Sequence, residues 1–222
     1  GNYSAPGFVD PIINFSQETC AIPVDNVPPC PPQLTISTLC DGASNLLGWH
    51  APADTCPTDM ARYYILFTPV RGTPSVIDSI TSPYDTSYLH KPPAGIAGCY
   101  AIVAADSVGN RSDTGNVVCV DYNACPVYSL PNIFTPNGDN RNDLFIPFPG
   151  FTSVSKINME IRDRWAKRVF STTDPAILWD GRDETTGQPC SDGTYFYTCD
   201  VTENTLDGER VRNLHGSVTI LR

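Results

Sequence analysis

Residues 137–143 form a polar segment, NGDNRND, whose side chains could bind a cation. Asn137, Asp139 and Asp143 supply oxygen atoms at short spacing, and calcium favours several such ligands around one loop. Calcium is therefore the one metal that the sequence suggests, and no other cofactor is expected. Arg141 stands where an EF-hand loop needs an oxygen ligand, so the segment is not an EF-hand. Asx-turns that satisfy the local backbone explain the same residues without an ion.

Other acidic residues also lie close together in the sequence. Asp180, Asp183 and Glu184 could form the paired carboxylates of a glycoside hydrolase. Their position beside the turn Trp179-Asp180-Gly181 favours the alternative, in which they cap the turn and keep it soluble. A further acidic pair beside Cys56 is a second calcium candidate, namely Asp54 with Asp59.

The three histidines do not assemble a recognisable catalytic centre. His50, His90 and His215 lie in different segments, and the chain contains no G-x-S-x-G, H-E-x-x-H or glycine-rich phosphate loop. A nucleophile, a base and an orienting partner therefore cannot be assigned from any motif. We expect the protein not to be an enzyme.

The nine cysteines point to an oxidising compartment. No two are spaced C-x-x-C, the spacing that structural zinc sites and thioredoxin-like redox sites generally use. Disulfides are therefore expected, and they require an oxidising destination such as the periplasm, the cell surface or the medium.

Two disulfide pairings can be argued from local sequence. Cys190 and Cys199 flank a turn followed by a strand and are expected to close a short loop. Cys99 and Cys119 bracket a hairpin and are expected to pair across it, although Cys119 with Cys125 is a competing choice. The remaining connectivity is not readable from the sequence.

Charge and hydropathy exclude two classes of partner. The chain has 14 basic and 24 acidic residues and a formal net charge of −10, which argues against binding to nucleic acid or to an anionic membrane surface. No apolar run approaches the length of a membrane span. The expected partners are therefore proteins or glycans.

The elements that position these residues are expected to be strands. The 21 prolines interrupt helices throughout the chain, so an all-β fold is predicted. Seven short alternating or β-branched runs in about 90 residues predict a sandwich. These runs are residues 34–36, 45–49, 63–67, 75–80, 88–89, 100–104 and 116–120.

Proline-rich steps divide the chain into three parts. Pro-Pro-Cys-Pro-Pro at 28–32 and Cys125-Pro126 mark the boundaries, because prolines stiffen linkers and do not pair in central strands. Residues 1–29 are interpreted as the end of a preceding module with a proline-rich linker. Residues 30–124 and 125–222 are each predicted to be a β-sandwich.

The middle part resembles a fibronectin type III domain. Trp49 stands where that family has its core tryptophan, and Tyr100 to Ala104 with Gly109 fits its Y-x-V-x-A-x-x-x-x-G stretch. Independently of the family, Trp49, Tyr64 and Tyr100 are predicted to be core aromatics between two sheets.

The last part contains several uncommon sequence words in a fixed order. Ile157, Met159 and Ile161 alternate as an inward face, and residues 162–167 form a basic turn before Val169. The words are LPNIFTPNGD at 130–139, DRWAKRVF at 163–170, WDG at 179–181, GTYFY at 193–197 and VTILR at 218–222.

This order resembles the gliding motility-associated C-terminal domain, the type B sorting domain of the type IX secretion system. One departure is Ala166, which occupies the usual glycine of the D-R-W-G turn and is strained if that turn needs a positive φ. The GTYFY and WDG words also resemble the immunoglobulin-like domain of flagellar hook-capping proteins. Two tandem immunoglobulin-like or fibronectin type III-like β-sandwiches are therefore expected.

The resemblance implies recognition without catalysis. Domains of this class direct a periplasmic cargo to an outer-membrane translocon, with PorP/SprF-like outer-membrane proteins as expected partners, and are linked to delivery to the cell surface. A carboxyl-terminal edge strand offers unpaired backbone groups for strand addition. The candidate contact residues are Gly216, Val218, Ile220 and Arg222 of that strand, and Arg162, Arg164, Lys167 and Arg168 of the basic turn.

Two alternatives to this interpretation stay open. The four basic residues are equally well explained as the solvated tip of a hairpin. The protein as a whole could also be an adhesin or carbohydrate-binding fragment of a modular surface protein, in which exposed aromatic rings stack on sugars. The rings considered for that role are Tyr63, Tyr84, Tyr88 and Tyr122.

Overall fold

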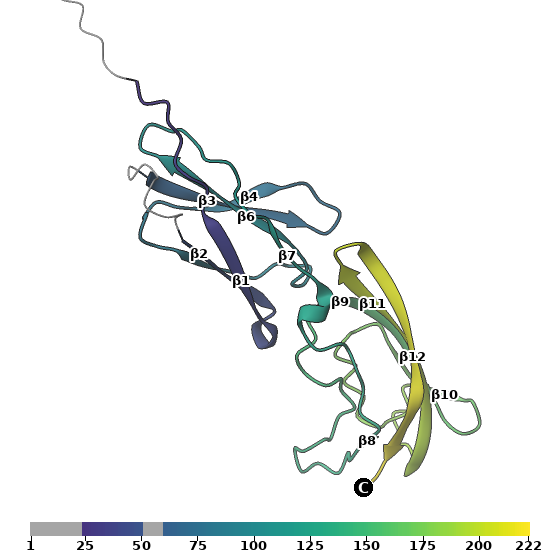
Figure 1. The fold of residues 1–222 in the computed structure, drawn as a ribbon. Helices are drawn as coiled ribbons and strands as arrows, with labels where there is room; N and C mark the ends of the chain where they lie inside the picture. Colours follow the sequence, from purple (N-terminus) through teal and green to yellow (C-terminus); the bar gives the residue numbers. More distant parts are fainter. Residues whose placement is uncertain (1–23, 51–59) are drawn as a thin grey trace, which may run out of the picture.

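The computed structural model describes residues 24–50 and 60–222 of the chain (Figure 1). The described regular elements are β-strands, apart from two short 3₁₀ turns, η1 (Cys40–Gly42) and η2 (Tyr122–Ala124). The predicted all-β class is therefore confirmed. Most of the segment interpreted as a preceding module lies outside the described residues, and so do Asp54 and Asp59.

Strands β1 to β7 form the first module, a sandwich of two sheets (Figure 1). One sheet has the order β1-β2-β5, and the other has the order β4-β3-β6-β7. All seven predicted strands are present. Their bounds are β1 (Gln33–Leu39), β2 (Ser44–His50), β3 (Met60–Pro69), β4 (Ser75–Ile80), β5 (Ser87–His90), β6 (Gly98–Asp106) and β7 (Val118–Val120).

The core of the first module lies between these two sheets. Trp49 from β2 and Tyr63 from β3 are buried and meet edge to face, with ring centroids 5.3 Å apart. The hydroxyl of Tyr100 accepts a hydrogen bond of 2.9 Å from the buried amide of Asn45. Trp49 and Tyr100 are therefore core aromatics, as predicted. The prediction for Tyr64 was wrong, because Tyr64 points out of the core and lies under the guanidinium of Arg111.

Strands β8 to β12 form the second module around one five-stranded sheet of order β10-β9-β11-β12-β8. The neighbouring strands are antiparallel except β8, which runs parallel to β12. The layer facing this sheet consists of loops joined by isolated bridges, such as Phe145 with Trp179. The strand bounds are β8 (Ile133–Phe134), β9 (Val154–Arg162), β10 (Arg168–Thr172), β11 (Gly193–Thr205) and β12 (Gly208–Ile220).

The core of the second module is aliphatic on the sheet and aromatic in the facing layer. Ile157, Met159 and Ile161 are fully buried, which confirms the inward face predicted for this strand. Trp179 packs against the rings of Phe134, Phe145, Phe170 and Tyr195. Its indole N–H donates to the carbonyl oxygen of Arg182 at 2.8 Å, so the WDG turn is anchored by a core side chain.

The linker between the modules is fixed to both of them. Cys125 is bonded by a disulfide to Cys40 of the first module. Asp121 caps η2, and its carboxylate also accepts the backbone N–H of Leu206 from the β11–β12 hairpin at 2.9 Å. Arg210 of the same hairpin lies over the ring of Tyr122, 4.7 Å from its centroid. The two modules are thus connected by more than the chain itself.

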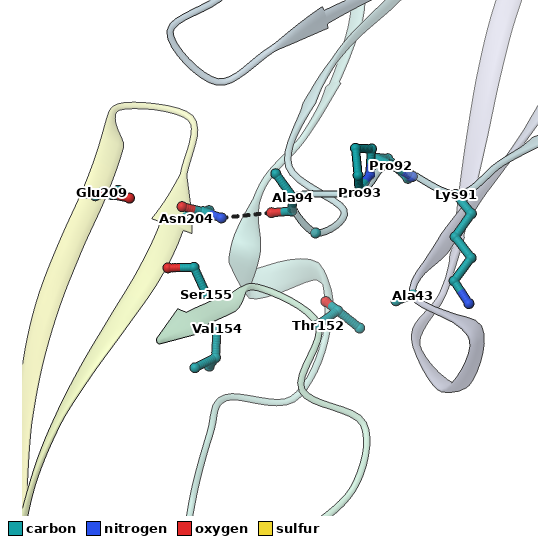
Figure 2. A pocket seen from close by; sticks show the side chains of 11 residues that line it. Ala43, Lys91, Pro92, Pro93, Ala94, Thr152, Val154, Ser155, Asn204 and Glu209 are labelled. Carbon is teal, nitrogen blue, oxygen red and sulfur yellow. Dashed lines mark hydrogen bonds between the residues drawn. The ribbon is translucent and has the colours of Figure 1, made fainter. Parts of the chain in front are cut away.

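The two modules approach each other closely beside this linker. Gly95 has a φ of +96°, and a Cβ atom there would lie 2.6 Å from the carbonyl oxygen of Thr152. The amide of Asn204 donates to the carbonyl oxygen of Ala94 at 2.7 Å (Figure 2). Only a glycine therefore fits at position 95.

Among the described residues, no helix could span a membrane.

Candidate recognition surface

The hairpin between β9 and β10 presents the predicted basic turn. Its five-residue loop is organised by Asp163, whose carboxylate accepts the backbone N–H groups of Trp165 at 2.8 Å and Lys167 at 2.9 Å. The backbone N–H of Ala166 donates to the carbonyl oxygen of Asp163 at 3.0 Å. The shape of the turn is therefore set by the carboxylate of Asp163.

Ala166 adopts a φ of +64° at the position where the resembled motif has glycine. This is the left-handed region, in which a Cβ atom is unfavourable by about 1 kcal/mol. The turn thus has the positive φ that was the condition for strain at Ala166. The rest of the loop holds alanine in this conformation through the contacts of Asp163.

Three of the four predicted cations are bound to carboxylates of this chain. The shortest nitrogen-to-oxygen distances are 2.6 Å for Arg162 with Glu160, 2.5 Å for Lys167 with Asp183, and 3.1 Å for Arg168 with Glu184. Arg164 makes no ion pair with any described residue. Only Arg164 among the four is thus left with a charge that a partner could neutralise.

The acidic residues near the WDG turn serve these ion pairs. The hydrogen bond from the Lys167 ammonium, with backbone N–H donors from Thr186 and Thr185, lowers the pKa of Asp183 to about 2. Glu184 is held by Arg168 and Ser171, and Asp180 pairs with Arg182 at 3.4 Å. The three carboxylates considered for glycoside hydrolysis are therefore engaged with cations and with the turn itself.

Trp165 is the most exposed large hydrophobic side chain among the described residues of the second module. Its exposed fraction is 82%, and it lies between Arg164 and Ala166 at the tip of the hairpin. Beside it is a cleft of about 430 Å³, lined by residues 163–165 and 191–196. Phe196, which lies opposite Arg162 across the β9–β11 pairing, adds a second ring that is 53% exposed. The tip therefore combines an unpaired cation, two exposed rings and a cleft.

The final strand does not present the face that was predicted for it. Val218 and Ile220 are fully buried in the core of the second module, so their side chains cannot contact a partner of the folded domain. Thr219 and Ile220 are also paired with Ile133 and Phe134 of β8. The prediction of an open edge over residues 216–222 was therefore wrong for Thr219 and Ile220, because β8 pairs with them.

Arg222 is bound within the module as well. Its guanidinium donates to the carbonyl oxygen of Cys190 at 2.7 Å and pairs with Asp192 at 2.9 Å. A longer contact of 3.4 Å reaches the carbonyl oxygen of Gly181. Arg222 thus ties the last residue to two loops of the facing layer, and its expected role in translocon contact stays a prediction.

The open edge of β12 lies earlier in the strand. β12 pairs with β11 from Gly208 to Ile220, but no described strand pairs with its other side between residues 208 and 218. Of the two predicted contact residues in this stretch, Val218 is buried and Gly216 is half-buried on the same inward face. Unpaired backbone groups suited to strand addition are therefore available before residue 219, not after it.

The NGDNRND loop uses its acidic oxygens on its own backbone. The Asp143 carboxylate accepts the N–H groups of Gly138 and Asn140, each at 2.7 Å. Asp139 accepts the N–H of Arg141 at 2.8 Å, and Asn137 accepts the N–H of Asp139 at 3.1 Å. No cluster of three or more acidic, cysteine or histidine side chains among the described residues is arranged for a metal. Calcium binding by Asn137, Asp139 and Asp143 stays a prediction.

The two predicted disulfides have different outcomes. Cys99 and Cys119 are bonded across the β6–β7 pairing, with Cα atoms 4.0 Å apart. Cys190 and Cys199 are both free and buried, so that prediction was wrong. Cys199 is the seventh residue of the extended strand β11, which places it roughly 20 Å from the strand's start, and a disulfide needs Cα atoms within about 7 Å. Cys125 bonds Cys40, which excludes the competing pairing.

The tyrosines considered as a sugar platform do not gather on one surface. Tyr63 is buried in the core of the first module, and Tyr122 lies under Arg210 at the linker. Tyr88 is half-buried on β5, and Tyr84 alone is strongly exposed. Glycan binding by the first module stays a prediction that rests on one ring.

A second concave surface lies where the modules meet. A cavity of about 800 Å³ separates the segment from Lys91 to Gly95 of the first module from residues of β9, β11 and β12 in the second (Figure 2). Lys91 lies on one wall, and Asn204 and Glu209 lie on the other. None of the residues singled out from the sequence lines this cavity.

The geometry of the second module can be compared with known families. Residues 128–219 match the model of the CHU_C type IX secretion signal domain. This segment runs from the buried Tyr128 almost to the end of strand β12 and contains the basic hairpin, the WDG turn and the exposed Trp165. The match supports a role as a C-terminal sorting signal, implies export out of the cell, and suggests contact with the secretion machinery. Assignment to type B stays a prediction.

Solved structures with similar arrangements are fibronectin type III arrays. The three FN1–FN3 domains of chicken CNTN1 share 15% identity at a TM-score of 0.35, covering 98% of this chain and 76% of that one. The central fibronectin type III array of RIM-binding protein shares 14% identity at a TM-score of 0.32, covering 89% of this chain and 70% of that one. A segment of two fibronectin type III domains from chicken tenascin shares 12% identity at a TM-score of 0.36, covering 86% of this chain and 98% of that one. At these scores the sandwich fold rests on the strand pairing itself. No curated protein sequence matches the chain.

The sequence analysis singled out the basic residues of the β9–β10 hairpin but not its tryptophan. A signal for Trp165 was available, because a large apolar residue between Arg164 and Ala166 in a polar turn has no core position to fill. The contact between Tyr122 and Arg210 was also missed, since 88 residues separate the two side chains. No local pattern could have found that pair.

Proposed function

We propose that the second module is a sorting signal that the type IX translocon reads in its folded state, and that it delivers a modular protein to the cell surface. The observation that carries this proposal is the match of residues 128–219 to the secretion signal domain. The expected partners are the outer-membrane translocon and a PorP/SprF-like outer-membrane protein. The first module would then be part of the exported cargo.

The geometry is compatible with recognition after folding. The second module has a closed hydrophobic core of 15 buried residues, and its tip is pinned by Asp163. Its charged side chains mostly bind one another, so the surface has a fixed pattern and does not rely on mobile charges. A rigid and accessible feature is what a reader of folded cargo requires.

Export of a reporter tests the proposal. The reporter would be fused in front of residues 1–222 and expressed in a bacterium that has a type IX system. We expect the reporter outside the cell with the full chain and in the periplasm when residues 128–222 are deleted. Inactivating the translocon should also leave the full fusion in the periplasm.

The matched control replaces residues 128–222 with a second copy of the first module, which keeps size and fold class similar. This fusion should stay in the periplasm. The proposal is wrong if the deleted fusion or the control fusion reaches the exterior as well as the full chain does.

A further inference from the structure

The tip of the β9–β10 hairpin has features of a protein docking site that a prediction from the basic residues alone does not include. Trp165 is 82% exposed, although a tryptophan contributes a large apolar surface that folding normally removes from water. Its backbone is fixed by Asp163, so the ring is presented on a rigid loop. Rigid presentation lowers the conformational entropy lost on binding.

The charges around this ring leave one position open. Arg162, Lys167 and Arg168 are bound to carboxylates of the module, whereas Arg164 has no ion pair among the described residues. Two carboxylates also line the cleft: Asp163 accepts the backbone N–H groups of Trp165 and Lys167, and Asp192 on the far wall is paired with Arg222. A ligand entering from solvent therefore meets one free guanidinium, which a carboxylate would complement.

The cleft beside the ring gives the ligand a place to insert. It measures about 430 Å³ and is lined by Arg164, Trp165, Phe196 and the segment 191–194, among others. Phe196 is 53% exposed, so the cleft has aromatic surface from both the β9–β10 hairpin and strand β11. Tryptophan and arginine are the residues that most often dominate protein interfaces.

From these observations we infer that Trp165 and Arg164 are the anchor by which the translocon docks this module. The partner surface would be a protein loop that carries a carboxylate for Arg164 and an apolar side chain for the cleft. The inference rests on the proposed function and names the contact that this function needs. The recognition site then consists of Arg164 and Trp165 at the tip and not of the three paired cations.

Substitutions in the full chain test this contact. We expect Trp165→Ala and Arg164→Glu each to lower the amount of external reporter by about tenfold, the size of effect typical of a dominant interface residue. Trp165→Phe and Arg164→Lys keep the ring and the charge and should restore part or most of the delivery. Because both side chains are exposed, the melting temperature should not change.

Two control variants separate this site from other exposed residues. Tyr84→Ala removes the strongly exposed ring of the first module and should leave delivery unchanged. Arg168→Ser removes a paired cation of the same hairpin and should have much less effect than Arg164→Glu. Equal losses from Arg164→Glu and Arg168→Ser would contradict the inference, because a paired cation would then matter as much as the unpaired one.

The possible results distinguish the inference from the proposed function. If deleting residues 128–222 abolishes export but Trp165→Ala is exported normally, the docking site is wrong and the sorting function stands. If the deletion has no effect, both are wrong. If Trp165→Ala is exported normally and instead loses binding to a glycan array, the cleft takes a sugar, and docking of a protein loop is overturned.

Discussion

The first module contains one described disulfide and shares the other with the linker, whereas the second module contains all eight described ion pairs and two buried free thiols. The modules are similar in fold class but differ in what reinforces the core. The first has few charges to pair, and two of its four cations, Arg62 and Arg111, lie over Tyr64, while the second ties its loops with carboxylates. One module thus depends on the oxidation state of its surroundings and the other does not.

The largest expected effect comes from reducing the disulfides. The bonds Cys40–Cys125 and Cys99–Cys119 close loops of 85 and 20 residues. Reduction of each bond should lower the unfolding free energy of the first module by about 3 to 5 kcal/mol, with the larger loss for the longer loop. The second module should be nearly unchanged. Calorimetry with and without dithiothreitol would show this as a shift in one of two transitions. A single transition that shifts as a whole would mean that the modules unfold as one unit.

The next effect concerns Glu203, a buried carboxylate of the second module. Burial raises the pKa of Glu203, but hydrogen bonds from Arg212 and Arg210 outweigh it, so the pKa is lowered and the group is charged. Glu203→Gln removes the charge that these two guanidinium groups share. We expect a loss of about 2 to 3 kcal/mol in the second module, less than for a fully buried pair because both arginines reach solvent.

The matched control for this variant is Glu209→Gln, on the same hairpin but exposed and without an ion pair among the described residues. It should change the unfolding free energy by less than about 0.5 kcal/mol. Urea unfolding of both variants measures the difference. A similar loss in the two would indicate that general charge, and not the buried network, stabilises the hairpin.

A smaller effect is expected from the free thiol of Cys199 at alkaline pH. Burial raises the pKa of Cys199 from 9.0 to about 11, so the folded state holds the proton over a range in which the unfolded chain has released it. This contribution to stability is complete below pH 9 and is lost as the pH rises towards 11, by about 2 kcal/mol. Cys199→Ala should remove this part of the pH dependence. Unfolding free energies of both proteins at pH 8, 9 and 10 test it.

Strand positions could be predicted because alternation and turn residues are local properties. All seven strands of the first module were found in this way, and so was the inward face of β9. The prediction of which way a side chain points was wrong where polar and apolar residues do not alternate. Residues 63–67 are all apolar, so the pattern could not tell that Tyr63 points inward and Tyr64 outward.

Features that depend on distant segments could not be predicted. The end of β12 was interpreted as an open edge because nothing in the local sequence shows that β8, 86 residues earlier, pairs with it. The disulfide expected between Cys190 and Cys199 assumed a closed loop where the chain is extended. The basic turn was located correctly, but its neutralisation depends on Asp183 and Glu184, which the fold brings from another loop.

The smallest effect compares the same substitution in both modules. Ala166 has a φ of +64° in the second module, and Ala43 has a φ of +47° in the first. Glycine adopts this conformation without the Cβ clash, so Ala166→Gly and Ala43→Gly should each raise the stability of their own module by up to about 1 kcal/mol. Ala94→Gly, at an exposed position without a positive φ, should lower stability because glycine only adds freedom to the unfolded chain. Calorimetry of the three variants measures these shifts. A gain at Ala43 without one at Ala166 would mean that the contacts of Asp163 already remove the strain, so that the tip beside Trp165 is held in its shape at no cost in stability.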